Sequence, residues 1–259
     1  MEKCKTLITA INKGTDMQPF ASQTIKDIVT QNFRTASVFE KYSLDFCCKG
    51  GITINDACRE KQIDPSNVIA DLLTLNTSDD SSNQRFNQWD ADFLAMYIIE
   101  NHHAYVRQAI PSLIAHTQKV ASVHGERHPE MKHVADIFCT VANEMLSHMH
   151  KEEHILFPYI VSLARTAKEK RSTSGSPFGS VRNPIRMMEQ EHESAGSLMY
   201  EIRELTDNYT IPGDACTTYN VTLKELQEFE HDLHQHVHLE NNILFPKATR
   251  IEEDLVSKK

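Results

Sequence analysis

The sequence predicts an all-α protein, in which a small N-terminal helical domain precedes a helical bundle. Three observations predict this fold class. Long segments after Trp89 carry apolar residues at helical spacing, strand-type alternation is absent, and an eleven-residue pattern occurs twice, from residues 148 and 236, which is 88 residues apart. Eight glycines in 259 residues also suit a mainly helical chain.

Composition divides the chain into four parts. Residues 1–22 are expected to form an N-terminal tail, and residues 23–75 a small helical domain. A polar stretch rich in Ser, Asp and Asn begins at residue 76 and lacks helical periodicity, so residues 76–88 are predicted to be a linker. Residues 89–255 form the larger domain. A chain of 259 residues is long enough for two domains that each bury a core.

Helix-start signals define the small domain. Thr24 and Thr53 each stand three residues before an aspartate, which is the spacing of an N-cap residue and an acidic residue in the first turn. Asp64 followed by Pro65 predicts the start of a third helix, because proline is favoured at the first helical position.

The larger domain contains four long helical segments. Proline at position 129 marks the start of the second segment, and two loops rich in Ser, Thr, Gly and Pro separate the later ones. The predicted helices cover residues 90–120, 129–169, 182–206 and 217–250.

An internal repeat connects the two halves of this domain. The sequences HMHKEEHILFP (148–158) and HVHLENNILFP (236–246) agree at H-x-H-x-E-x-x-I-L-F-P. Upstream of them stand ENHH (100–103) and EQEH (189–192), whose last histidines are 192 − 103 = 89 residues apart. Each half therefore has one histidine on its first helix and a His/Glu pair on its second, which predicts a four-helix bundle with pseudo-twofold symmetry.

The repeated pairs carry the chemistry of a metal site. His148 and Glu152 are four residues apart, as are His236 and Glu240, so each pair occupies one helix face and can reach a common ion. Imidazole and carboxylate together suit iron, manganese or zinc. Six such groups suit two metal ions, with two histidines on each and both carboxylates bridging. The predicted ligands are His103, His148, Glu152, His192, His236 and Glu240.

Each pair taken alone could be an ordinary contact on an exposed helix, but such a contact has no reason to recur within the same frame. His102 competes with His103 on apolar spacing, and the repeat selects His103 because it aligns with His192. His150 and His238 are about 200° around the helix from the proposed ligands and are expected to face outward.

The remaining histidines are given simpler roles. His124 is interpreted as a partner of a ligand or, preferably, as a loop residue. The Ile-Leu-Phe triplets at 155–157 and 243–245 are expected to pack in the core, and the proline after each triplet to bend or end its helix. The histidines expected at the surface are His116, His128, His133, His154, His231 and His234.

These segments together resemble the Repair of Iron Centres family of di-iron proteins, whose C-terminal part is hemerythrin-like. The resemblance rests on YSLDFCCKGG (42–51), HMHKEEHILFP, MEQEHESAG (188–196), DACTT (214–218) and HLENNILFP, in this order. It implies that the four histidines of the predicted set are terminal ligands of two non-haem irons, oxo-bridged when oxidised, and that the two glutamates bridge them. It also implies restoration of iron-sulfur clusters damaged by nitric oxide or peroxide.

Cys47 and Cys48 are the one chemical feature of the small domain. A disulfide between neighbours closes a strained ring, so we expect free thiols. Two interpretations stay open: one packed and one exposed thiol, or a pair with a redox, iron-transfer or nitric-oxide-reactive role. The six cysteines contain no C-x-x-C spacing, which argues against a structural zinc site or a disulfide framework.

Composition limits the partners. The formal net charge of −9 and the pI near 5.9 argue against binding to nucleic acid or to an anionic membrane. The N-terminus does not read as a signal peptide, although a cleaved organelle presequence stays open, and no apolar run approaches the roughly 18 residues of a membrane span. We therefore expect a cytoplasmic protein, with a homodimer among the states left open.

Three functions are compatible with these features. The first is a di-iron protein that repairs damaged iron-sulfur clusters by donating iron, with the proteins that carry those clusters as partners. The second is an enzyme that reduces nitric oxide, and the third is a hemerythrin-like module that binds O2 or nitric oxide. The cysteine pair argues against a simple oxygen carrier, because oxygen storage needs no thiols.

Overall fold

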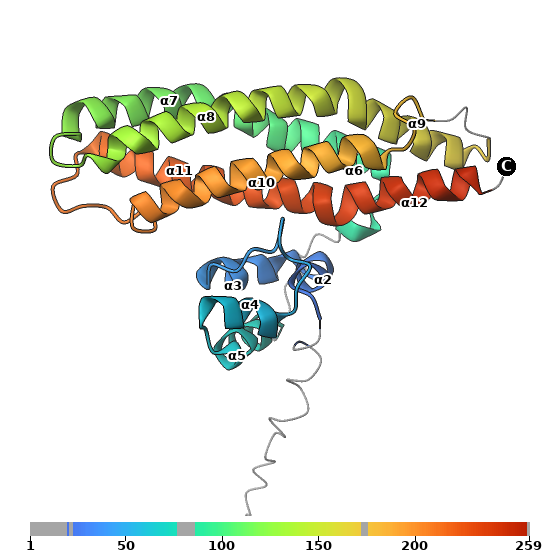
Figure 1. Ribbon diagram of the computed structural model, residues 1–259, viewed down its shortest axis with the longest axis horizontal. Coiled ribbons are helices and arrows are strands. Elements are labelled where there is room, and N and C mark those ends of the chain that lie inside the picture. Colours follow the sequence, from blue (N-terminus) through green and yellow to red (C-terminus); the bar gives the residue numbers. More distant parts are fainter. Residues whose placement is uncertain (1–19, 21–22, 77–85, 172–175, 258–259) are drawn as a thin grey trace, which may run out of the picture. The chain divides into compact units, whose positions relative to one another are not determined.

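The computed structural model describes residues 20, 23–76, 86–171 and 176–257, and within them the helices are joined by turns and loops, with one isolated bridge between Thr24 and Thr53. The predicted all-α class is confirmed. The chain forms two compact units, residues 1–84 and 85–259, which are described separately (Figure 1).

The N-terminal unit is a cluster of short helices around a small apolar core. The side chains of Thr24 and Thr53 accept hydrogen bonds from the third residue after each of them, at 3.3 and 3.2 Å, so both predicted N-caps are confirmed. The Asp64 side chain accepts a hydrogen bond from the N–H of Ser66 at 2.9 Å where the last helix begins. The elements are α2 (Ile25–Gln31), η1 (Phe33–Thr35), α3 (Ala36–Lys41), α4 (Ile54–Lys61) and α5 (Pro65–Asn76).

The C-terminal unit contains four long helical segments, each called here a rod. The first rod reaches His124, four residues beyond its predicted end. Three rods contain a π-helical segment between two α-helices, and the third rod is one continuous α-helix. In chain order the elements are η2 (Phe86–Gln88), α6 (Ala91–Ile98), η3 (Ile99–His103), α7 (Ala104–His124), α8 (Glu130–Lys151), η4 (Glu152–Leu156), α9 (Phe157–Lys168), α10 (Arg182–Leu205), α11 (Thr217–Leu239), η5 (Glu240–Leu244) and α12 (Phe245–Val256).

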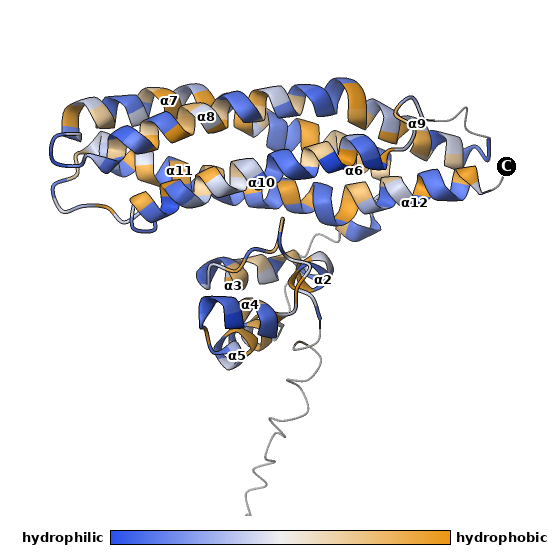
Figure 2. Cartoon of the chain, viewed as in Figure 1, coloured by the Kyte–Doolittle hydropathy of each residue, from blue (hydrophilic) through white to orange (hydrophobic). Residues whose placement is uncertain are grey.

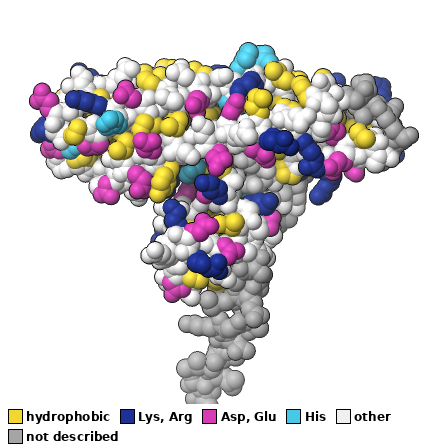
Figure 3. Space-filling view, viewed as in Figure 1, with side chains coloured by type: hydrophobic (Ala, Val, Ile, Leu, Met, Phe, Trp, Pro, Cys, Tyr) yellow, Lys and Arg dark blue, Asp and Glu magenta, His cyan; other side chains and the backbone are white. Residues whose placement is uncertain are grey.

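The four rods pack as a closed bundle, in which α7 contacts α8 and α11, and α10 contacts α8 and α11. The buried residues of the rods are mostly apolar, and hydrophobic and hydrophilic residues alternate along each helix (Figure 2). On the face drawn in Figure 3, acidic and basic side chains are interspersed over the bundle.

The two prolines do not end their helices. In the first copy of the eleven-residue repeat (148–158), called here the first frame, the N–H of Phe157 donates a hydrogen bond to the carbonyl of Glu152, five residues earlier. The α-helix α9 begins at Phe157. Pro158 therefore stands in the first turn of an α-helix, where a missing N–H is tolerated. The same arrangement occurs at Phe245 and Pro246, so of the two expected effects, a bend or an end of the helix, the end is wrong.

The apolar core beside these π segments includes most of the two Ile-Leu-Phe triplets. Leu156, Phe157, Leu244 and Phe245 are each at most 1% exposed. Ile155 is the exception, because its side chain is 48% exposed whereas its counterpart Ile243 is 3% exposed. The expected core position of Ile155 is therefore wrong, since the outer face of the helix is open to solvent in the first frame and covered in the second.

Candidate metal centre

The six predicted ligands meet inside the bundle and are called here the metal centre. Each side chain is at most 2% exposed, and all four rods contribute. The π segments lie at the metal centre: η3 ends on His103, and η4 and η5 begin on Glu152 and Glu240.

The imidazoles form two pairs. In the first pair, the Nε2 atoms of His103 and His236 lie 3.1 Å apart. In the second pair, the Nε2 atoms of His148 and His192 lie 3.0 Å apart. Because Nε2 of every ring points inward, each pair presents two nitrogen donors to the same small space.

Both carboxylates lie between the two pairs. Glu240 places Oε1 2.9 Å from Nε2 of His236 and Oε2 3.0 Å from Nε2 of His192. Glu152 places Oε2 3.3 Å from Nε2 of His103 and 3.1 Å from Nε2 of His148. The cluster therefore divides into two four-residue groups that could each hold a metal ion and that share both glutamates.

Unsatisfied oxygens support this interpretation of the cluster. Oε1 of Glu152 is buried without a hydrogen bond, and the close contacts of Oε2 of Glu152 and of Glu240 are with imidazole nitrogens. Burying a carboxylate without hydrogen bonds is costly, and a bound cation offsets the cost. Imidazole and carboxylate donors in this number fit two borderline-hard metal ions such as iron.

The charges of the six side chains compensate one another. Burial alone would lower the pKa of His103 and His148, but the hydrogen bonds and charges of the glutamates outweigh it and raise the pKa to about 9 and about 10. Burial works against the ionised form of Glu240 as well, yet the charge of His236 and its other imidazole contacts hold the pKa of its carboxyl well below the usual value. Metal binding must therefore displace protons from imidazoles.

Known proteins are similar to this sequence over most of its length. Residues 94–248, which include all six residues of the metal centre, match the Hemerythrin HHE cation binding domain, and residues 21–76 match a Domain of Unknown function (DUF542). The iron-sulfur cluster repair protein ScdA of Staphylococcus haemolyticus is 33% identical over 223 residues, which cover 86% of this chain and 96% of that protein.

Two proteins named iron-sulfur cluster repair protein YtfE give similar matches. The one from an Enterobacter species is 33% identical over 229 residues, covering 88% of this chain and 97% of its own. The one from Yersinia pestis is 35% identical over 217 residues, covering 84% and 92%. The chain belongs to this iron-sulfur cluster repair family. The resemblance inferred from the sequence motifs is thereby confirmed.

Carboxylates contact the outer nitrogens of two histidines of the metal centre. His103 Nδ1 lies 2.6 Å from Glu153 Oε1, and Glu153 is also paired with Arg107. His148 Nδ1 lies 3.0 Å from Glu191 Oε2. In metal sites, such contacts fix the tautomer and the ring orientation of a histidine ligand. These carboxylates were not predicted from the sequence, although each is adjacent in sequence to a predicted ligand.

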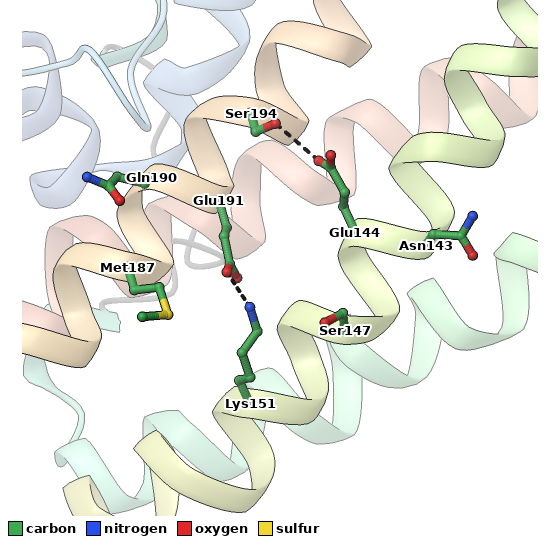
Figure 4. A pocket seen from close by; sticks show the side chains of 8 residues that line it. All are labelled: Asn143, Glu144, Ser147, Lys151, Met187, Gln190, Glu191 and Ser194. Carbon is green, nitrogen blue, oxygen red and sulfur yellow. Dashed lines mark hydrogen bonds and ion pairs between the residues drawn. The ribbon is translucent and has the colours of Figure 1, made fainter. Parts of the chain in front are cut away.

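Glu191 also connects the metal centre to a surface hollow. The hollow lies between α8 and α10 and has a volume of about 470 Å³. Figure 4 shows Lys151 reaching across it to Glu191, and Ser194 bonded to Glu144. The pKa of Glu191 is lowered to about 2, chiefly by its hydrogen bond with His148 and then by Lys151. The outer partner of one ligand is therefore accessible from this hollow.

The other two histidines of the metal centre, His192 and His236, differ in the contacts of their Nδ1 atoms. His192 Nδ1 lies 2.9 Å from Asn241 Oδ1, whereas His236 Nδ1 is buried without a hydrogen bond. His102 stacks on His236 instead, with ring centroids 5.7 Å apart and 12° between the planes. His102 is also bound to Asp232 at 2.8 Å. The repeat therefore selected the residue that joins the cluster, and His102 packs beside it.

Two other histidines differ from expectation. His150 is exposed as predicted, but His238 is 1% exposed, so its expected outward position is wrong. Five consecutive residues from His236 to Glu240 are buried, which means that α11 is covered on every side at this level. His124 is neither a loop residue nor a partner of a ligand, because it is the buried last residue of α7 and contacts Cys216.

The cysteine pair of the N-terminal unit is organised by one aspartate. Oδ1 of Asp45 accepts hydrogen bonds from the N–H groups of Cys47 and Cys48, both at 2.9 Å. The sulfurs are 3.8 Å apart and neither cysteine forms a disulfide, with Cys47 buried and Cys48 partly exposed. The hydrogen bond with Cys48 and then burial raise the pKa of Cys47. These three residues could also hold a metal ion.

Among the described residues, no helix is both long enough and apolar enough to cross a membrane.

Proposed function

We propose that this protein holds two iron ions in the metal centre and repairs damaged iron-sulfur clusters by donating iron. The observation that carries the proposal is the pair of buried two-histidine groups that share Glu152 and Glu240. The matches cover 96%, 97% and 92% of the three relatives, and the names of these relatives support the repair role.

The charge of the ligand set favours release. Two carboxylates and four neutral imidazoles supply a protein charge of only −2 to two cations, so electrostatic retention is weaker than in a carboxylate-rich site. Iron is both the redox-active group and the cargo in this proposal. Because a ferrous ion carries less charge than a ferric ion, the two glutamates hold it less strongly, and reduction should loosen the cargo.

Residues that contact the ligand histidines from outside affect how strongly iron is held. Glu153 and Glu191 each accept a hydrogen bond from Nδ1 of a ligand histidine, which makes the ring a better donor at Nε2. Arg107 and Lys151 neutralise these two carboxylates from the surface side. The first pair and the second are thus supported by the same kind of charge-compensated contact.

A second candidate function is reduction of nitric oxide. Its supporting observation is that the two groups share both carboxylates, so two ions would lie close enough for small molecules to bind side by side. The match to the HHE cation binding domain is also compatible with a third candidate, a module that binds O2 or nitric oxide. The donor proposal differs from both because only a donor must lose its metal to act.

One experiment on one sample separates these functions. Protein purified without oxygen is assayed for metal content, and equal portions are kept oxidised or reduced with dithionite. The donor proposal predicts much faster transfer of iron from the reduced portion, either to an apo-cluster acceptor protein or to a ferrous chelator. If the reduced protein keeps both irons against the chelator while it consumes nitric oxide over many cycles, the reductase function replaces the donor function.

A further inference from the structure

A cysteine and a histidine meet at an end of the bundle remote from the metal centre. His124 is the last residue of α7, and Cys216 is the N-cap residue of α11. The connections α7–α8 and α10–α11 lie at this same end (Figure 1). Since His124 follows His103 by 124 − 103 = 21 residues on one rod, the two sites are separated by roughly 30 Å at the helical rise of about 1.5 Å per residue.

The contact has a defined hydrogen-bond direction. Nε2 of His124 lies 3.1 Å from Sγ of Cys216. The imidazole is 5% exposed, and its Nδ1 is buried without a hydrogen bond. A buried N–H without an acceptor is rarely tolerated, so the ring hydrogen belongs on Nε2, from which it donates to the sulfur. A thiolate accepts such a bond far better than a thiol does.

The helix end also places donors beside the sulfur. Cys216 stands at the N-terminus of α11, a helix of 23 residues, and its side chain makes no capping hydrogen bond. The first N–H groups of a helix lack partners within the helix and carry partial positive charge. Cysteines in such positions are found as reactive thiolates.

The neighbouring charges compensate one another. Asp214 is paired with Nε2 of His128 at 3.0 Å and with Arg127 at 2.9 Å, so its negative charge is offset two residues before the thiol. The other ring nitrogen of His128 lies 3.0 Å from Glu130. Burial raises the pKa of Tyr219, whose ring packs on both imidazoles, to about 12, which keeps its hydroxyl neutral.

Cys216 differs from the other described thiols in its accessibility. Cys47 and Cys58 are buried, and their pKa values are raised, by the hydrogen bond with Cys48 and by burial respectively. Cys139 is partly exposed, but it lies in the middle of α8 and its nearest donor, the Gln118 amide, is 3.8 Å away. Exposure, a helix N-terminus and a close ring donor occur together at Cys216.

We propose that Cys216, with His124 as its hydrogen-bond donor, is a second reactive site that undergoes exchange with small disulfides of the glutathione disulfide type. The Sγ thiolate attacks one sulfur of the disulfide, a new S–S bond forms as the old one breaks, and the other half leaves as a thiolate that takes a proton from water. The incoming disulfide is the oxidant, and Cys216 ends as a mixed disulfide.

The test measures alkylation by iodoacetamide at a single pH of 6.5 in the full, metal-loaded chain, with each cysteine peptide followed by mass spectrometry. Cys139, which is partly exposed in the middle of α8, serves as the internal reference. Cys216 should react at least about tenfold faster than Cys139, because it is exposed, stands at a helix N-terminus and has an imidazole nitrogen beside its sulfur.

Two further measurements complete the test. His124→Leu should lower the alkylation rate of Cys216 toward that of Cys139 and leave the rate of Cys139 unchanged. Incubation with glutathione disulfide at pH 6.5 should place the mixed disulfide on Cys216 before Cys139. Equal alkylation rates at Cys216 and Cys139 in the wild-type protein overturn the proposal whether or not the variant folds, and so does a mixed disulfide that forms first on Cys139.

Discussion

Replacing Glu152 by glutamine should remove iron from both halves of the metal centre. Glu152 lies within 3.3 Å of one imidazole of each pair, and its side chain is fully buried. The change Glu152→Gln keeps the volume and removes the negative charge, so it tests the charge and little else. A matched control is His150→Ala, two residues away on the exposed face of the same helix.

The size of the effect follows from the burial of the carboxylate. Removing one partner of a buried charge pair costs about 3–5 kcal/mol. At about 1.4 kcal/mol for each factor of ten, this corresponds to a loss of roughly 10² to 10⁴ in affinity. Both ions should be affected, because Glu152 Oε2 contacts one imidazole from each pair. Glu240→Gln should behave in the same way, since its two oxygens face different pairs.

The assay is iron content per chain after equilibration with a chelator of moderate affinity, with circular dichroism to verify that each variant is helical. Wild-type protein and His150→Ala should retain about the same iron, and both glutamine variants should retain far less. Equal losses from Glu152→Gln and His150→Ala, or full retention by Glu152→Gln in a folded protein, would refute the assignment of the inward helix face.

Three other predictions concern residues around the metal centre and beyond it. The double change Cys47→Ser with Cys48→Ser should leave the iron content intact and reduce repair of a damaged cluster in an activity assay. Glu191→Gln should weaken metal binding by about 10- to 100-fold in a chelator titration, because it removes the charged acceptor behind a ligand imidazole. The hydrogen bond with Asp214 raises the pKa of His128, so Asp214→Asn should lower it in an NMR titration. The stability that this pair contributes is present below the unfolded histidine pKa of about 6.5 and is lost as the pH rises through the higher folded value.

Each of these has a control within the chain. Glu189→Gln changes an exposed glutamate on the same helix as Glu191 and should leave metal affinity unchanged. Cys139→Ser should leave repair unchanged, and His133, which is exposed, provides a reference resonance in the titration. Unchanged repair in the double cysteine variant would make that pair structural. An unaltered His128 pKa in Asp214→Asn would contradict the hydrogen bond described for it.

Sequence patterns were sufficient for the fold class, the helix starts and the composition of the cluster. The repeat was the decisive signal, because periodicity alone could not choose between His102 and His103. Alignment with His192 made the choice, and the two Nε2 pairs now place His103 inside the cluster. The N-caps at Thr24 and Thr53 were predictable because capping depends on local hydrogen bonds alone.

Features set by the tertiary environment could not be predicted. His150 and His238 occupy the same place in two sequences that agree at seven of eleven positions, yet one is exposed and the other buried. Ile155 and Ile243 differ in the same direction. Burial there depends on what covers the outer face of each helix, and the frame carries no information on it. The π segments were also missed, since inserting one extra residue into a helical turn leaves no fixed composition.

The distribution of the metal centre over all four rods sets an order of events during synthesis of the protein. Each two-histidine group needs a residue from the last rod: the first needs His236, and both need Glu240. A ribosome-bound chain that ends before residue 236 therefore offers neither complete group, however well its earlier helices have formed. Under the proposed function, iron enters both positions only after the fourth helix has been translated and has docked, so loading would be a step of maturation that follows synthesis of nearly the whole chain.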